Sequence, residues 1–313
     1  MIIHAMTQHA LPSGTCALSH LGVIAAEGPD AASFLHGQLT QDFSLLDGTR
    51  ARLAALCTAK GRMIASFVGI RPQPESILLV CSQDILAATL KRLQMYVLRA
   101  KAKLRDASAE FVLYGLAGEP QAGNDIEPAS APWQRSIKGE ASVVSLYPAD
   151  GVARALWIAP AGTPAPVGPE LDLPSWQWGE VRSGVAMLTT PVLDAFVPQM
   201  VNYESIGGVN FKKGCYPGQE VVARSQFRGT LKRRAYLMRA DSAVSAGQEV
   251  FAASDAQQPV GTVVEAAQGP DGSWAALVSM QIAALDAGQL RAGGPEGIAL
   301  SVQPLPYELL ADI

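Results

Sequence analysis

The apolar positions between residues 84 and 97 follow a helical repeat. They are separated by four, three and four residues, which places them along one stripe of a helix: Leu86, Leu90, Leu93 and Val97. Asp84 stands just before this stripe, where its carboxylate can cap the first turn. The pattern therefore predicts an amphipathic helix that begins at Asp84 and buries one face.

Shorter patterns predict further helices and a series of strands. A helix is expected over residues 31–39 behind a capping Asp30, another over residues 175–185, and a helical turn or two after Gly218. Apolar runs bounded by turn residues predict strands at 17–28, 52–58, 63–70, 77–81, 101–106, 110–116, 141–147 and 153–158. Segments rich in Pro and Gly at 118–132 and 160–174 are expected to be loops.

After Leu231 the pattern changes to short strands separated by Gly, Pro and Asp. The expected strands are 235–240, 249–253, 259–266, 274–279 and 298–303. Such spacing is typical of a small antiparallel barrel or sandwich. Because mixed helices and strands precede it, we predict an α+β fold with a C-terminal β-domain.

Size and composition narrow the class of protein. A chain of 313 residues with 49% hydrophobic and 17% charged residues is expected to form two or three compact domains. No apolar run approaches the ~20 residues needed to cross a bilayer. The first six residues lack the basic flank and apolar core of a signal peptide. We therefore expect a cytoplasmic protein with no membrane partner.

The cysteines are few and far apart: Cys16, Cys57, Cys81 and Cys215. So few cysteines in a chain of this size do not indicate a disulfide framework. The absence of a CxxC pair or other clustered ligands also argues against a self-contained zinc or iron–sulfur site. If iron–sulfur chemistry is involved, the sequence favours a protein that serves a cluster without holding one permanently.

Charge is unevenly distributed. The formal net charge of −4 argues against a protein that binds nucleic acid over its whole surface. However, residues 212–239 contain eight basic residues and a single acidic one, Glu220. Residues 91–105 contain six basic residues and no acidic one. Each stretch alone is explained by a solvated face, whereas two together favour a local anion site.

The segment of residues 213–220, named here the central segment, combines the features of a ligand site. Two glycines flank its core and allow a tight turn. If a helix starts near Gln219, Cys215 lies just ahead of a helix N-terminus and close to Lys213, and both favour the thiolate. Cys215 is therefore the best candidate for a reactive cysteine. The alternative is a small buried hydrophobic residue in a tight loop.

The other side chains of the central segment are less decisive. Tyr216 can stack on a flat heterocycle or pack in the core. Gln219 and Glu220 form a donor–acceptor pair suited to a pterin or amide edge, but they equally suit the surface of a first helical turn. From the residues alone, the central segment indicates a ligand site of unspecified chemistry.

The central segment resembles the K-G-C-[YF]-x-G-Q-E motif of the YgfZ family of folate-binding proteins, which are relatives of the glycine-cleavage T-protein. An F-L-x-G-Q-x-T-x-D block at residues 34–42 and an A-K-G-[RK] turn at residues 59–62 resemble other parts of this family. Further matches are Phe196-Val197-Pro198-Gln199, Asn202, Gly207-Gly208, Phe227-Arg228-Gly229 and Pro304-Leu305-Pro306-Tyr307. The resemblance covers essentially the whole chain.

The resemblance implies a three-domain, T-protein-like cloverleaf around a central folate channel, ending in an antiparallel β-barrel. Residues 1–117 and 175–230 would form the channel, 118–174 a further α+β segment and 231–313 the barrel. The implied cofactor is tetrahydrofolate or a one-carbon derivative, which can be polyglutamylated. The implied partners are iron–sulfur client proteins such as a tRNA methylthiotransferase, without direct binding of nucleic acid.

The resemblance also implies residues that contact the folate. Trp178 falls where the family has a folate-contacting tryptophan, although a core aromatic residue of the 175–185 helix is the alternative, and Leu21 replaces a second folate-contacting tryptophan. Glu180 and Arg182 lie close to Trp178 in the sequence. The guanidinium of Arg182 suits the glutamate carboxylate of folate, although a salt bridge within the helix explains it nearly as well. Lys213 is expected to bind folate or another anion.

Whether the chain is an enzyme depends on one missing acid. The T-protein activates its folate with a carboxylate in a G-G-x-x-D-D segment, which corresponds here to residues 60–65, where no carboxylate occurs. Without this charge, aminomethyl transfer lacks its main electrostatic element. The sequence therefore favours an accessory factor for iron–sulfur enzymes over a one-carbon transferase or demethylase, with a tRNA-binding module as the third alternative.

Overall fold

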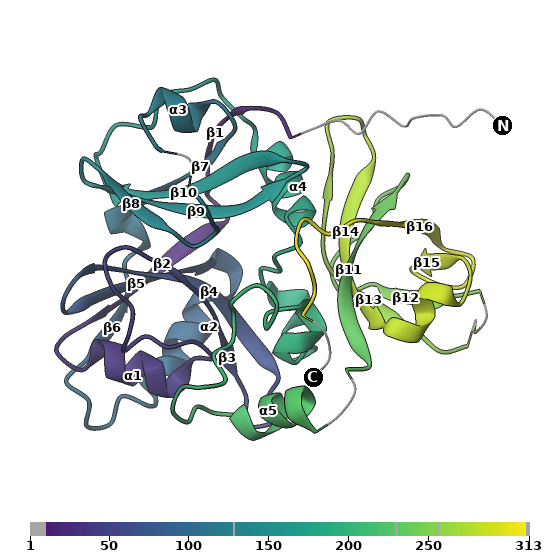
Figure 1. Cartoon of the computed structure of the whole chain (residues 1–313), viewed down its shortest axis with the longest axis horizontal. Helices are drawn as coiled ribbons and strands as arrows, with labels where there is room; N and C mark the ends of the chain where they lie inside the picture. The colour runs from purple at the N-terminus through teal and green to yellow at the C-terminus, as the bar shows by residue number, and fades with distance from the viewer. Residues whose placement is uncertain (1–10, 128, 229–230, 254, 256, 311–313) are drawn as a thin grey trace.

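The computed structural model describes residues 11–127, 129–228, 231–253, 255 and 257–310 (Figure 1). The first six residues and Gly229, which entered the sequence predictions, lie outside this part of the chain. Two five-stranded sheets lie on one side of the molecule, and a closed β-barrel lies on the other. None of the described helices combines the length and apolar character needed to cross a bilayer.

The first sheet has the strand order β3-β4-β5-β2-β6 and is antiparallel throughout. Its strands are β2 (Leu21–Glu27), β3 (Arg52–Cys57), β4 (Met63–Gln73), β5 (Ser76–Ser82) and β6 (Lys103–Asp106). Helix α1 (Ala31–Gln38) follows β2, and the amphipathic helix α2 (Gln83–Gln94) packs on β2 and β6. Ser82, not Asp84, occupies the N-cap of α2, and Val97 lies beyond its end.

The second sheet has the order β1-β7-β10-β9-β8. Its strands are β1 (Gly14–Ala17), β7 (Phe111–Ala117), β8 (Arg135–Lys138), β9 (Ala141–Ala149) and β10 (Val152–Pro160), with short helices η1 (Ser108–Glu110) and α3 (Pro120–Gly123). Of the strand predicted over 17–28, residues 21–27 form β2, whereas Ala17 is the last residue of β1 and a turn at Ser19 and His20 separates the two strands. The second sheet thus combines β1 and β7, which lie within residues 1–117, with β8, β9 and β10, which follow residue 117.

The C-terminal barrel closes in the order β11-β14-β13-β12-β15-β16. Its strands are β11 (Arg233–Ala240), β12 (Glu249–Ala252), β13 (Gly261–Gln268), β14 (Trp274–Gln281), β15 (Leu290–Ala292) and β16 (Ile298–Gln303), with η4 (Ile282–Asp286) between β14 and β15. The prediction of an α+β fold with a C-terminal β-domain is confirmed. The sequence pattern missed β15 because it has only three residues.

The connection between the sheets and the barrel carries most of the remaining helices. They are α4 (Leu173–Arg182), η2 (Thr190–Val192), η3 (Pro198–Val201) and α5 (Gln219–Phe227). The carboxylate of Asp172 caps α4 by accepting a hydrogen bond of 2.9 Å from the Ser175 amide. One face of α4 packs on β13 and β14, and the helix also contacts β1 and β9. It therefore lies between the second sheet and the barrel.

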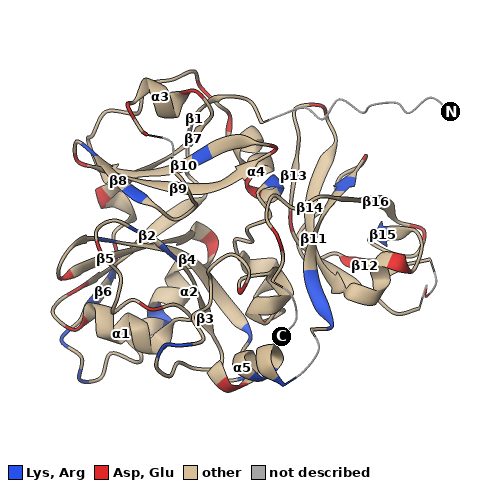
Figure 2. Ribbon diagram, viewed as in Figure 1, with Lys and Arg blue, Asp and Glu red and all other residues tan. Residues whose placement is uncertain are grey.

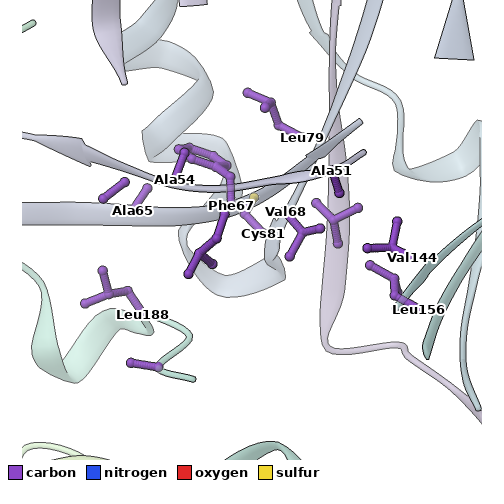
Figure 3. Packing of buried hydrophobic residues seen from close by; sticks show 14 of the residues in the cluster. Ala51, Ala54, Ala65, Phe67, Val68, Leu79, Cys81, Val144, Leu156 and Leu188 are labelled. Atoms are coloured by element: carbon purple, nitrogen blue, oxygen red, sulfur yellow. The ribbon is translucent and has the colours of Figure 1, made fainter. Parts of the chain in front are cut away.

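One apolar core joins the two sheets and reaches α4. Figure 3 shows part of it, with Phe67 and Val68 of the first sheet and Val144 and Leu156 of the second. The barrel has its own core around Met238, Val250 and Val278. The core between the sheets is thus the place where a central cavity can form.

Candidate functional site

A cavity with about 500 Å³ of empty space, including its mouth, lies between the two sheets and α4. It is named here the inter-sheet cavity. About 50 Å³ of this space admits water-sized molecules. The lining is mostly apolar and aromatic: Leu18, Leu21, Val68, Val80, Trp133, Leu146, Tyr147, Leu156, Trp176, Val185 and Met187, together with Arg154, Glu180 and Ser183.

Glu180 is the centre of a polar cluster at this cavity. Its Oε1 accepts a hydrogen bond of 2.9 Å from the indole of Trp176, and its Oε2 lies 3.0 Å from Nε2 of His20. Burial opposes ionisation of Glu180, but these hydrogen bonds and the charge of Arg154 hold its pKa below the usual value. An ionised carboxylate therefore faces a mostly apolar cavity that Arg154 and Ser183 also line.

Arg154 is a further residue of this cavity that the sequence pattern did not indicate. It lies in the apolar strand β10, its side chain is only 3% exposed, and its guanidinium carbon is 4.3 Å from the centre of the Trp176 ring. Burial lowers the pKa of Arg154 to about 10. Among the described residues, no group accepts a hydrogen bond from its Nε or Nη2. A single Arg within an apolar strand was the sequence signal for it.

The predicted folate contacts on α4 and at Leu21 of β2 do not all lie at this cavity. Glu180 and Leu21 line the inter-sheet cavity, whereas Trp178 and Arg182 do not. Trp178 packs at the β13–β14 turn, where a Cβ added to Gly269 would be 2.6 Å from the indole nitrogen. The structure therefore places Trp176, two residues earlier, at the cavity in the position expected for Trp178.

Arg182 has a protein partner of its own. Its Nε donates a hydrogen bond of 2.9 Å to Asp150, and its Nη2 also donates to this carboxylate. The guanidinium lies over Trp178 at 5.6 Å. Arg182 thus forms the salt bridge that was the alternative to a folate contact, although its partner lies outside the helix.

An aromatic row supports one wall of the cavity. Trp133 contacts Tyr147 with ring centres 5.9 Å apart, and Tyr147 contacts Tyr307 at 5.3 Å. The hydroxyl of Tyr307 donates a hydrogen bond of 2.7 Å to the carbonyl of Gly184, between the lining residues Ser183 and Val185. Tyr307, which belongs to the C-terminal family match of the sequence, therefore supports residues of the cavity wall.

The central segment lies elsewhere, because none of residues 213–220 lines the inter-sheet cavity. The ammonium of Lys213 donates hydrogen bonds to the carbonyls of His36 and Leu39 at the end of α1, and lies 4.5 Å from the centre of the buried Tyr216 ring. Burial lowers the pKa of Lys213 to about 8. Lys213 and Tyr216 thus anchor the central segment to α1. Gln219 and the exposed Glu220 begin α5.

Other motif residues hold the same region together. Oγ1 of Thr40 donates to the carbonyl of Gly208, and Nε2 of Gln41 donates to the carbonyl of Gly207, each at 2.7 Å. Nε2 of Gln199 donates 2.8 Å to the carbonyl of Val222 in α5. The separate motifs of the sequence therefore meet in one structural unit around the central segment.

The backbones of Gly218 and Gly61 lie very close to each other. Gly218 has a φ of +81°, and a Cβ at this position would be 2.4 Å from the carbonyl oxygen of Thr58 and 2.7 Å from the nitrogen of Gly61. Only glycine combines this backbone conformation with so little space. The turn between β3 and β4 therefore supports the start of α5 directly.

Cys215 is exposed, whereas the other three cysteines are buried. Desolvation raises the pKa of Cys16 to about 11 and that of Cys57 and Cys81 to about 12. His36 lies beside Gly214, the residue that precedes Cys215. A Cβ added to Gly214 would be 3.2 Å from Nε2 of His36. Nδ1 of His36 is 3.0 Å from Asp42.

The described residues contain no cluster of three or more His, Cys, Asp or Glu side chains that could hold a metal ion.

We expect iodoacetamide to modify Cys215 in the folded protein at least about 100 times faster than Cys16, Cys57 or Cys81, because reaction requires an accessible thiolate. Peptide mass spectrometry at pH 7.5 would follow each site separately. Denatured protein, in which all four thiols react, provides the control. Modification of Cys57 or Cys81 at a rate close to that of Cys215 would contradict the buried positions.

The two basic stretches do not form one continuous site. Figure 2 shows Lys and Arg along α5 and at the start of β11, where the exposed members are Lys212, Arg224, Arg228 and Lys232. Arg234 is instead buried and pairs with Glu204. In the other stretch, Arg105 pairs with Glu27 and Glu110. These contacts favour solvated faces and structural ion pairs over an anion site that joins the stretches.

Two proteins of similar sequence carry the same name. The chain is 30% identical over 317 residues to the tRNA-modifying protein YgfZ of Photorhabdus laumondii, covering 97% of this chain and 95% of that protein. It is 29% identical to the tRNA-modifying protein YgfZ of Sodalis glossinidius over 96% of this chain and 94% of that protein. No model of a protein family matches the chain.

Among solved structures, the aminomethyltransferase T of the glycine cleavage system from Bartonella henselae superposes with a TM-score of 0.69. The match covers 95% of this chain and 87% of that one, at 17% sequence identity. The prediction of a T-protein-like fold is thereby confirmed.

Proposed function

The chain belongs to the YgfZ family, and from this premise we propose that it binds a reduced folate in the inter-sheet cavity and supports iron–sulfur enzymes that modify tRNA. The observation that carries the proposal is a largely apolar cavity between the two sheets and α4, with one polar cluster on its wall. Such a lining suits a flat heterocycle that is oriented by few polar contacts. The related proteins named for tRNA modification supply the biological context.

The proposed ligand is tetrahydrofolate or a one-carbon derivative, with or without a polyglutamate tail. Trp176 and Leu21 would pack against the ring system, and Glu180 would contact its polar edge. Three domains would surround the ligand: residues 1–117 with 175–230, residues 118–174, and the barrel of residues 231–313. The second sheet, which joins the first two of these parts, supports a binding site shared between them.

We further propose an accessory role rather than aminomethyl transfer. Residues 60–65, at the turn between β3 and β4, contain no carboxylate, and the carboxylate of Asp194 that reaches Thr58 is exposed and does not line the cavity. An acid that activates a folate nitrogen has to lie within hydrogen-bond reach of it. The exposed Cys215 would act as a redox or transfer thiol toward an iron–sulfur client such as a tRNA methylthiotransferase.

Titration of the full chain with tetrahydrofolate under anaerobic conditions tests the ligand. We expect saturable binding by calorimetry, with quenching of tryptophan fluorescence. The Trp176→Phe variant should lose most of the quenching and bind about 5-fold more weakly, because packing against the larger ring is worth about 1 kcal/mol. Trp178→Phe, on the opposite face of α4, is the matched control. Absence of binding by the unaltered chain would refute the proposal.

The thiol is tested separately by Cys215→Ser. This variant should bind tetrahydrofolate with unchanged affinity but fail to restore tRNA methylthiolation in cells that lack the gene, because serine cannot perform thiol chemistry. Cys16→Ala, which alters a buried thiol, should restore it. Full restoration by Cys215→Ser would remove the thiol from the function while leaving the folate site intact.

A further inference from the structure

The segment of residues 91–104, named here the basic loop, leads from the last turn of α2 into β6, an edge strand of the first sheet on the side away from the barrel (Figure 1). Nε2 of Gln94 closes the base of the loop by donating a hydrogen bond of 2.9 Å to the carbonyl of Leu104. The amide of Lys101 donates 2.7 Å to the carboxylate of Asp30. Between Gln94 and Leu104, three side chains pack inward against the core: Val97, Ala100 and Ala102. The basic loop therefore has a fixed shape and a defined outer face.

The outer face of the basic loop carries apolar side chains close together. Met95, Tyr96 and Leu98 are 65%, 44% and 85% exposed. They are three of the ten large apolar side chains that are exposed in the described part of the chain, yet they fall within four consecutive positions. Single exposed apolar residues are ordinary, whereas a cluster of them indicates a contact surface.

The basic loop also carries five cationic side chains: Lys91, Arg92, Arg99, Lys101 and Lys103. Among the described residues, none of these five forms an ion pair. Glu27 lies opposite Lys103 where β2 pairs with β6, but its carboxylate is held by Arg105. Because acidic residues outnumber basic ones in the whole chain, 28 to 24, the basic loop is a local exception that attracts anions.

The combination of these side chains distinguishes between anionic partners. Lysine, which supplies three of the five cations, is depleted in contacts between proteins. A second copy of the chain would bring the same cations together across the interface, which is unfavourable. Nucleic acids are bound by cations together with aromatic or polar side chains, so the aliphatic Met95 and Leu98 would gain little there. An anionic lipid surface suits both groups, because its phosphates attract the cations and its acyl chains accept the aliphatic side chains.

We propose that the basic loop binds the surface of an anionic lipid bilayer, with Met95 and Leu98 inserted below the headgroups and the five cations among the phosphates. Tyr96 would lie at the level of the headgroups, where its ring is in apolar surroundings and its hydroxyl is hydrated. Such a peripheral contact needs no spanning segment, and none occurs among the described helices. The proposal revises the expectation that the protein has no membrane partner, and it does not depend on folate binding.

Co-sedimentation of the full chain with lipid vesicles tests this contact. We expect vesicles of equal parts phosphatidylglycerol and phosphatidylcholine to bind the chain at least about 10-fold more tightly than vesicles of phosphatidylcholine at about 0.1 M NaCl, because each cation near an anionic surface changes the affinity about fivefold. Raising the NaCl concentration to about 0.5 M should remove most of this preference. Equal binding to both kinds of vesicle, or binding to neither, would overturn the proposal.

Lys101→Gln combined with Lys103→Gln assigns the attraction to the basic loop. This variant should bind the phosphatidylglycerol vesicles about 10- to 30-fold more weakly. Lys212→Gln combined with Lys232→Gln removes two exposed cations elsewhere and is the matched control. Its affinity should change by less than about threefold, because charges beyond a Debye length of the bilayer are screened. Equal losses in the two variants would indicate attraction to the whole molecule and refute a contact through the loop.

Met95→Ala combined with Leu98→Ala tests insertion of the apolar side chains. This variant should bind the phosphatidylglycerol vesicles at least about fivefold more weakly, because affinity scales with the apolar area that enters the bilayer. Leu45→Ala, at a leucine that is 70% exposed outside the basic loop, should bind like the unaltered chain. Unchanged binding after both alanine substitutions in the loop would show that no insertion occurs and contradict the proposal.

Competition with RNA distinguishes a lipid surface from a nucleic acid. We expect a single-stranded RNA at equal phosphate concentration to leave the chain on the phosphatidylglycerol vesicles. Its phosphates attract the cations, but it offers no acyl chains to Met95 and Leu98. Displacement of the chain from the vesicles would assign the basic loop to nucleic acid and overturn the proposal.

Discussion

Replacing Arg234 with methionine is expected to lower the free energy of unfolding by about 3–5 kcal/mol, the usual effect of leaving one member of a buried ion pair alone. Nη1 of Arg234 lies 2.6 Å from Oε1 of Glu204, whose side chain is fully buried, and Nη2 donates 2.7 Å to the carbonyl of Leu310. Without the guanidinium, the carboxylate of Glu204 has to be protonated or hydrated to remain inside.

Urea unfolding at pH 7, followed by circular dichroism, measures this loss. Arg239→Met is the matched control on the same strand, because Arg239 pairs at 3.3 Å with an Asp241 that is 88% exposed, and such surface pairs contribute less than about 1 kcal/mol. Adding Glu204→Gln to Arg234→Met should recover part of the loss. Equal effects of the two arginine substitutions would contradict a buried pair.

Gly218→Ala is expected to lower the free energy of unfolding by about 3 kcal/mol or more, because it adds a steric conflict with the β3–β4 turn to an unfavourable backbone conformation. The conflict is with backbone atoms of Thr58 and Gly61, which cannot rotate away. The start of α5 would have to move, and the central segment with it.

Gly272→Ala separates the two causes. Gly272 also has a φ of +81°, but a Cβ there has no neighbour within 4 Å. Its substitution should cost only the backbone term of about 1–2 kcal/mol. Comparable losses in the two variants, measured by the same urea titration, would show that contact between Gly218 and the turn is not important.

The sequence predicted the fold well where apolar repeats were long. The strands of the first sheet and the longest strands of the barrel follow such runs, and the antiparallel barrel after Leu231 was foreseen. Strand β8 (Arg135–Lys138) was missed because Arg, Ser and Lys alternate with a single Ile. Strand β1 (Gly14–Ala17) was also missed, because it has only four residues and pairs with the distant β7.

The site was predicted less completely, for a different reason. Trp176 and Trp178 both lie on α4 and are both buried, since this helix packs between the second sheet and the barrel. A helix that is covered on opposite faces gives no apolar stripe to indicate which tryptophan lines the cavity. Arg154 belongs to a strand without a motif, and only the structure shows that it lines the cavity.

The position of Tyr307 also affects when the cavity can form during synthesis. This residue comes after the last barrel strand, yet its hydroxyl donates to the carbonyl of Gly184 and its ring contacts Tyr147 on the cavity wall. Because the ribosome releases the chain from its N-terminal end, both sheets emerge well before their support does. The proposed folate binding should therefore begin only after Tyr307 has left the exit tunnel, and nascent chains stopped in the barrel should not retain tetrahydrofolate.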